Sequence, residues 1–208
     1  MRTIETNVYK FDELSDAAKE RARDWFREAS AGDTPDCALD DAVTIAALMG
    51  IEIERRHWTN SHGFKGSSPE ISYCAGHVQG DGAAFTGRYR YRKGAVKAVR
   101  EYAPQDAELR RIAEALQDVQ KRNFYQLTAR MSEGRRGLWT TAEVERYDGA
   151  AMTDGAEDEI SELMRDFAAW IYDQLIAEVD YQSSDEAVDE SIEANEYEFT
   201  EQGNRARA

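Results

Sequence analysis

The chain has 208 residues, of which 41% are hydrophobic and 10% aromatic, a composition that supports a packed core and excludes wholesale disorder. No stretch approaches the roughly 18 apolar residues that a membrane span requires, and the first residues lack the apolar core of a signal peptide. Only Cys37 and Cys74 are present, far apart in sequence, so we expect two free thiols in a cytoplasmic protein.

The net charge of −15 is distributed unevenly along the chain. Residues 1–153 hold 24 acidic and 23 basic residues, whereas residues 154–201 hold 17 acidic residues and the single base Arg165. A field of this sign repels membranes and nucleic acid and attracts basic proteins. The acidic region at 154–201 is therefore the first functional clue.

The first half of the chain alternates between expected helices and strands. Ser15 is a suitable N-cap for a helix that runs to about Ala31, and Thr34 and Pro35 can begin a second helix that Gly50 closes. Apolar patterning predicts strands at 3–9, 51–58, 71–75 and 83–91, and the Gly- and Ser-rich composition of 59–68 predicts a loop. The residues QGDG at 79–82 predict a tight turn between the last two strands, which we expect to pair.

The second half is predicted to be mainly helical. Apolar spacing indicates helices at 94–102, 105–122 and 154–181, and strands at 124–131 and 139–147 that pair across the polar loop SEGRRG. A further helix is expected from Ser183, with Glu186 completing a capping box, to about Asn195, and a short strand at 197–200. These elements predict a single α+β domain over 1–208, with a small antiparallel sheet packed with helices and an acidic helical subregion at 154–201.

The acidic helices are the leading candidate for a partner-binding surface. Their carboxylates lie away from the expected apolar faces at Glu159, Glu162, Asp166, Asp173, Asp185, Glu186, Asp189, Glu190 and Glu193. Like charges at i,i+4 spacing destabilise a helix by a few tenths of a kcal/mol each, which suggests selection for something other than stability. A rigid row of carboxylates can occupy a groove meant for nucleic-acid phosphates. The alternatives are a solvated face that maintains solubility, or pairing with basic residues elsewhere in the chain.

A basic patch is the second candidate. It comprises Arg88, Arg90, Arg92, Lys93, Lys97 and Arg100, interleaved with Tyr89 and Tyr91. Basic and aromatic residues together are typical of single-stranded nucleic-acid platforms. Strand alternation, however, places the arginines and tyrosines on opposite faces, which favours tyrosines in the core and arginines that point outward or pair with acids.

Motifs for metal binding and catalysis are weak. His57, His62, Cys74 and His77 are metal-ligand types in one region, but their mixed spacings do not match the usual zinc patterns, so we expect no metal and no cofactor. The QGDG turn is not a phosphate-binding loop, and no nucleophile or metalloprotease motif is visible. We therefore expect a protein that is not an enzyme.

Several segments together resemble a family of small bacterial, phage and prophage proteins, some of which carry the label antitoxin of toxin–antitoxin stability system. They are FDELSDAAKERARDWFREA, QGDGAAF, YRYRKGAVKAVREYAP, LQDVQKRNFYQLTA and SDEAVDESIEANEYEFTEQG, and they span nearly the whole chain. The resemblance brings no catalytic residues. This chain has ISYCAGHV before the QGDG turn, where the family has a more aromatic segment, which argues against a pocket at this turn and against a family-wide metal site at Cys74 and His77.

The sequence and the resemblance together predict an inhibitor from a phage or mobile element that binds a basic protein partner. It would either neutralise a toxin or block a host defence nuclease by imitating nucleic-acid charge. The alternative is a nucleic-acid-binding accessory protein that uses the patch at 88–100. A third hypothesis, an unrecognised hydrolase or metal protein, has the least support.

Overall fold

A computed structural model describes residues 7–74, 81–134 and 138–206 of the chain. Its mixture of helices and antiparallel strands confirms the predicted α+β class. The chain forms two compact units, the first from 1–35 with 177–208 and the second from 36–176, and the single domain stays a prediction. Among the described helices, none combines the length and apolar character needed to cross a membrane.

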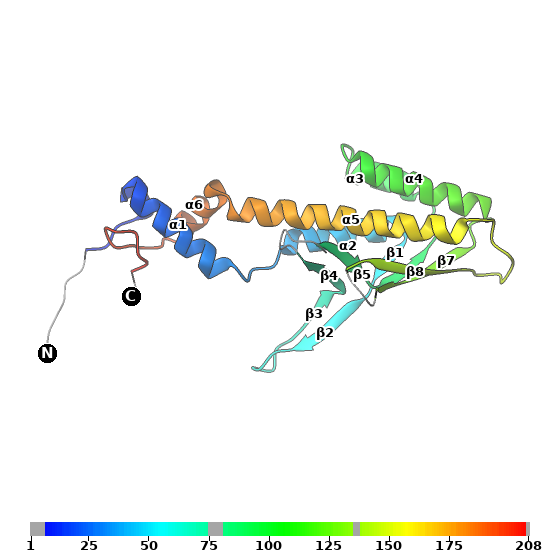
Figure 1. Ribbon diagram of the computed structural model, residues 1–208, viewed down its shortest axis with the longest axis horizontal. Helices are drawn as coiled ribbons and strands as arrows, with labels where there is room; N and C mark the ends of the chain where they lie inside the picture. The colour runs from blue at the N-terminus through cyan, green and yellow to red at the C-terminus, as the bar shows by residue number, and fades with distance from the viewer. Residues whose placement is uncertain (1–6, 75–80, 135–137, 207–208) are drawn as a thin grey trace. The chain divides into compact units, whose positions relative to one another are not determined.

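The first unit packs the helix α1 (Asp16–Ser30) against α6 (Asp185–Ala194) (Figure 1). A short 3-10 helix, η1 (Phe11–Glu13), precedes α1. The core of this unit consists of Phe11, Leu14, Ala18, Ala22, Val188, Ile192 and Phe199. Ala18 and Ala22 on α1 and Val188 and Ile192 on α6 repeat at i, i+4 spacing, so each helix packs through one apolar side.

Two details of the first unit differ from expectation. The N-cap of α6 is Ser184, whose hydroxyl accepts from the Ala187 N–H, and Ser183 is instead the last residue of α5 (Ala156–Ser183). The capping box with Glu186 therefore does not form, because Glu186 is one residue too close to the cap. In place of the strand expected at 197–200, Phe199 makes isolated bridges to Tyr9 and Arg205. The strand expected at 3–9 lies mostly outside the described residues.

The second unit contains a four-stranded antiparallel sheet in the order β1-β6-β7-β8. Its strands are β1 (Ile51–Ile53), β6 (Gly87–Arg90), β7 (Leu127–Glu133) and β8 (Thr140–Arg146). The inward face packs on helices α2 (Asp36–Met49), α3 (Ala95–Tyr102), α4 (Ala107–Arg122) and α5 up to residue 176. Figure 1 shows α4 and α5 on one side of these strands. The pairing predicted for the strands near 124–131 and 139–147 is confirmed.

Three stretches of the chain, 51–59, 65–74 and 82–90, are long strands. Each consists of two labelled strands that pair with different partners. After β1 comes β2 (Arg55–Thr59), which pairs with β3 (Lys65–Pro69); β4 (Ile71–Cys74) pairs with β5 (Gly82–Phe85). The changes occur at one junction, where the Glu54 N–H donates to the Thr86 carbonyl, the Glu70 N–H to Glu54 and the Thr86 N–H to Glu70, at 2.7–3.0 Å. The expected pair of strands on either side of the 79–82 turn is confirmed, while residues 79 and 80 lie outside the described part.

The prediction of a loop at 59–68 was wrong over its second half. Small residues suggested a loop, but Gly66 is opposite Trp58 in the β2–β3 ladder, and a Cβ at position 66 would lie 2.3 Å from the Trp58 ring. The glycine is thus required by cross-strand packing, a non-local cause that local composition does not reveal. Likewise, the single strand expected at 51–58 divides at Glu54 into β1 and β2.

Candidate functional site

The acidic residues of α5 are partly neutralised within the second unit. Arg111 on α4 donates to Asp166 at 2.5 Å, and Arg122 pairs with Glu159. Asp166 and Glu159 therefore do not belong to a row of carboxylates without partners. The sequence of α5 alone does not show this, because the cations that pair with them come from α4. Glu162 and Asp173 are exposed on the same helix.

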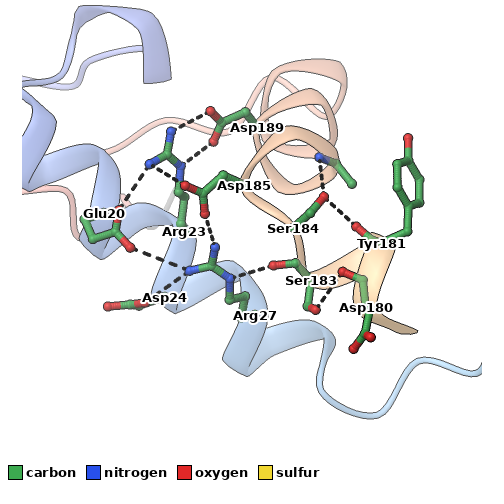
Figure 2. A network of polar contacts seen from close by, with 11 residues as sticks. Glu20, Arg23, Asp24, Arg27, Asp180, Tyr181, Ser183, Ser184, Asp185 and Asp189 are labelled. Carbon is green, nitrogen blue, oxygen red and sulfur yellow. Dashed lines mark hydrogen bonds and ion pairs between the residues drawn. The ribbon is translucent and has the colours of Figure 1, made fainter. Parts of the chain in front are cut away.

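Two acidic residues of α6 are held by arginines of α1 (Figure 2). Arg23 donates two parallel hydrogen bonds to the Asp189 carboxylate, both 2.7 Å long, and lies 3.4 Å from Asp185. Arg27 pairs with Asp185 and donates to the Ser183 carbonyl at 3.0 Å. The bond to Asp189 is the main cause that raises the pKa of Arg23, so this guanidinium stays charged. Asp185 and Asp189 thus fasten α6 to α1.

The remaining acidic residues of α6 form a row that we call the α6 ridge: Glu186, Glu190 and Glu193. Their i, i+4 and i+7 spacing places them along one side of the helix, and all three are exposed. In the described ranges no ion pair neutralises them. The first unit as a whole has 18 acidic and 8 basic residues, a net charge of −10.

The predicted basic patch is divided by the fold. On β6 the alternation is as expected, with Arg88 and Arg90 exposed and Tyr89 buried. Burial raises the pKa of Tyr89 to about 12, although a hydrogen bond with Gln120 opposes this effect. Arg92 donates to the carbonyl of Ala47.

The α3 end of the patch is partly neutralised. Arg100 and Lys97 lie 3.1 and 3.6 Å from Glu114 and Glu101 respectively. One alternative from the sequence was that this patch pairs with the C-terminal acidic helices. Lys97 and Arg100 instead pair with carboxylates of α3 and α4. The available positive charge is therefore on the strand and not on the helix.

Arg130 on β7, which the sequence interpretation missed, joins the two arginines of β6. It is directly opposite Arg88 in the β6–β7 ladder, and both side chains belong to the outward face of the sheet. Arg88, Arg90 and Arg130 make no ion pair with any other described residue. Like charges in directly opposed positions repel, but Glu52 and Glu143 are opposite Arg88 and Arg130 on the two edge strands and offset part of this repulsion.

The outward face of the sheet is hollowed. The hollow has a volume of about 1130 Å³, and the three arginines line it together with Arg92 and the side of α2. Three carboxylates of the edge strands also line it: Glu52 on β1, directly opposite Arg88, and Glu143 and Glu145 on β8, of which Glu143 is directly opposite Arg130. The positive charge is thus concentrated on the two central strands, between carboxylates on the edge strands.

Aromatic rings lie at the end of the same strands. Tyr91 lines the hollow and packs on Tyr125, with ring centroids 4.4 Å apart. Tyr89 is buried as expected, whereas Tyr91, which follows the last residue of β6, is only half-buried. Phe124 and Tyr147, exposed by 73% and 82%, lie at the adjacent ends of β7 and β8.

The turn that carries Phe124 and Tyr125 is strained and firmly held. Both residues have positive φ, 56° and 60°, a conformation that non-glycine residues adopt at a cost of about 1 to 2 kcal/mol each. The buried Gln120 amide accepts from the Leu127 N–H at 3.1 Å and donates to its carbonyl at 2.8 Å. Asn123, also buried, bonds Thr153 through both ends of its amide. Strained backbone conformations that several surrounding hydrogen bonds hold in place are found most often at functional sites.

The suspected metal ligands do not converge in the described residues. His57 and His62 lie on or beside the exposed β2–β3 pair, Cys74 ends β4, and His77 lies outside the described residues. Within the described ranges no group of three or more His, Cys, Asp or Glu side chains is arranged to hold a metal ion. Cys37 and Cys74 are both free and exposed thiols.

Comparison with known proteins gives one match. A family model described as "Domain of unknown function (DUF8835)" matches residues 35–185, which include the whole second unit and its arginine-lined hollow. No curated protein and no solved structure matches the chain.

Proposed function

Because the chain belongs to the DUF8835 family, a domain of unknown function, we propose its function from the chemistry of the matched region: it binds single-stranded nucleic acid, without catalysis, in the hollow of its four-stranded sheet. This proposal develops the accessory-protein alternative, which used the patch at 88–100, by keeping Arg88 and Arg90 and adding Arg130. The inhibitor and antitoxin roles stay predictions.

The observation that carries this proposal is the group of Arg88, Arg90 and Arg130. Three exposed guanidinium groups that make no ion pair with a described residue project from two neighbouring strands, and two of them are directly opposed, with Glu52 and Glu143 on the far side of each. Guanidinium matches phosphate oxygens in a two-pronged geometry and remains charged at every physiological pH. A phosphate placed between the opposed arginines would replace their repulsion by attraction.

The aromatic residues support a single strand over a duplex. Unpaired bases expose their faces, and stacking on an aromatic side chain stabilises binding by about 1 to 3 kcal/mol per base. Tyr91 lines the hollow, and Phe124 and Tyr125 are held nearby in a fixed turn. The local charge agrees, because residues 55–100 contain nine basic and two acidic residues, a net charge of +7 in a chain whose total is −15.

Fluorescence anisotropy with labelled single-stranded DNA and RNA at low salt tests the proposal. The double variant Arg88→Glu with Arg130→Glu should weaken binding by at least about tenfold, because it reverses the charge at two phosphate contacts. Arg165→Glu makes an equal change per residue at an exposed position on α5 that does not line the hollow, and it should bind as the wild type does. Wild-type protein that binds no single strand, or a double variant that binds normally, would refute the proposal.

A second candidate function is the acidic inhibitor hypothesis, with the binding surface limited to the α6 ridge. The α6 ridge supports it, because Glu186, Glu190 and Glu193 are exposed without a cationic partner in the described ranges, in a unit with a net charge of −10. The partner would be a basic protein, such as a toxin or a defence nuclease. Reversing all the acidic residues of α6 is a poor test, since Asp185 and Asp189 hold α6 to α1.

The sharper test reverses only the α6 ridge. Tagged wild-type protein should retain a basic protein from an extract of the native host at low salt and release it at high salt. The triple variant Glu186→Lys, Glu190→Lys and Glu193→Lys should retain none while keeping its helical circular dichroism. Equal retention by the two proteins would sink this candidate.

A further inference from the structure

The β2–β3 ribbon, residues 55–69, projects away from the other strands of its unit (Figure 1). Its five paired positions run from Arg55 opposite Pro69 to Thr59 opposite Lys65, and every residue of β2 is exposed. A two-stranded ribbon with no apolar face covered is marginal in water, so burial does not explain its regular structure. The junction at Glu54, Glu70 and Thr86 anchors its base.

The charge of this ribbon is of one sign. It contains Arg55, Arg56 and Lys65 and no acidic residue between Glu54 and Glu70. Arg55 donates to the hydroxyl and carbonyl of Ser67 at 3.1 and 3.0 Å, which braces its guanidinium across the ladder. Arg56 lies 3.3 Å from Glu70 at the base, an exposed pair that contributes little.

The tip of the ribbon is pre-organised around an exposed aromatic ring. The Asn60 side-chain oxygen accepts from the backbone N–H groups of His62 and Phe64 at 3.0 and 2.9 Å, and the Asn60 N–H donates to the Phe64 carbonyl at 2.9 Å. Gly63, with φ of +81°, completes the turn. Phe64 is nevertheless 72% exposed. The side-chain and backbone bonds therefore fix a turn whose most apolar side chain faces water.

We propose that this ribbon inserts into a groove of double-stranded DNA, with Phe64 against the base pairs and Arg55, Arg56 and Lys65 against the phosphates. The major groove is about 12 Å wide and admits a two-stranded ribbon, and an apolar side chain such as Phe contacts thymine methyl groups there. The absence of carboxylates from the ribbon sequence matches the uniform charge of the duplex. The ribbon thus provides a surface for duplex DNA that is separate from the single-strand hollow.

The experiment compares one 20-base-pair duplex with one single strand in anisotropy titrations of the full chain. Phe64→Ala should weaken duplex binding by about fivefold or more and leave single-strand binding unchanged, because the ring contacts the duplex alone. Phe64→Trp should restore duplex binding. Lys65→Glu should lower the slope of log affinity against log salt for the duplex by about one to two. Tyr181→Ala is the matched control, since it removes an exposed ring from α5 without touching the ribbon.

The outcomes separate this inference from the proposed function. The Arg88→Glu and Arg130→Glu variant should lose the single strand and keep the duplex, the reverse of Phe64→Ala. Absence of wild-type duplex binding, or full duplex affinity in both ribbon variants, would overturn the ribbon proposal and leave the hollow untouched. Binding of wild-type protein to vesicles with anionic phospholipid, lost in Phe64→Ala, with no duplex binding, would assign the ribbon to a membrane surface and also overturn it.

Discussion

The α1–α6 surface of the first unit and the outward face of the sheet in the second both carry rows of like charge, and they use them differently. On α6, Asp185 and Asp189 are matched by Arg23 and Arg27 of the neighbouring helix (Figure 2). On the sheet, Arg88 and Arg130 oppose each other and make no ion pair with a described residue, although Glu52 and Glu143 are opposite them on the edge strands. The comparison teaches that the amount of charge in a segment does not indicate how much is available to a partner.

Of the three changes considered, removing Arg23 should change the free energy of unfolding most. Arg23→Ala leaves the Asp189 carboxylate, which is only part-exposed, without its two hydrogen bonds. We expect the free energy of unfolding of the first unit to fall by about 1 to 3 kcal/mol. Denaturant titration followed by Trp25 fluorescence in that unit measures it. Arg21→Ala is the control, because Arg21 makes a single exposed hydrogen bond, to the Gln202 carbonyl, among the described residues; an equal effect of both would mean that the Asp189 contact stabilises nothing.

Alkaline pH should affect the second unit through Tyr89, which lies behind the arginines. Its pKa is about 12 in the folded chain and about 10 when unfolded, so folding favours the protonated phenol. The resulting stability is fully present below pH 10 and is lost as pH rises through 12, by roughly 2 to 3 kcal/mol in total. Unfolding titrations from pH 9 to 12 should show a steeper loss in the wild type than in Tyr89→Phe. Parallel pH profiles would contradict this prediction.

The smallest expected effect concerns the opposed arginines themselves. Arg130→Thr removes the repulsion with Arg88 and the attraction to Glu143, which is opposite Arg130 on β8, so stability should change by less than about 0.5 kcal/mol while single-strand binding weakens. Arg146→Thr is a contrasting control, because Arg146 pairs with Asp148 at 2.5 Å and its loss should destabilise. A loss of stability in Arg130→Thr as large as that in Arg146→Thr would show that the attraction to Glu143 outweighs the repulsion with Arg88.

The sequence predicted the elements whose signals are local. On α4 the stripe of Leu109, Ile112, Ala113, Leu116 and Val119 repeats at helical spacing, and all five residues are buried as expected. On β6 simple alternation separated Arg88 and Arg90 from Tyr89. In both cases the pattern that decides the structure lies within one element, so a single sequence contains it.

The features that sequence analysis missed depend on contacts between distant positions. Arg23 and Asp189 are 166 positions apart, and nothing in either segment indicates that they meet. Arg130 became a candidate only through its register opposite Arg88. A signal for the basic surface did exist, since residues 55–100 have a net charge of +7 and the cations at 88–100 were predicted as a patch, but Arg130 lies outside that range.

The junction of Glu54, Glu70 and Thr86 limits how this protein can vary in length. Each strand that crosses it belongs to one ladder before the junction and to another after it. Adding one residue near Thr86 would shift β6 by one position, turning Arg88 and Arg90 into the core and Tyr89 out into water. Insertions are therefore tolerated only in the turns. Each of the three strands must keep its present number of residues before and after the crossing point.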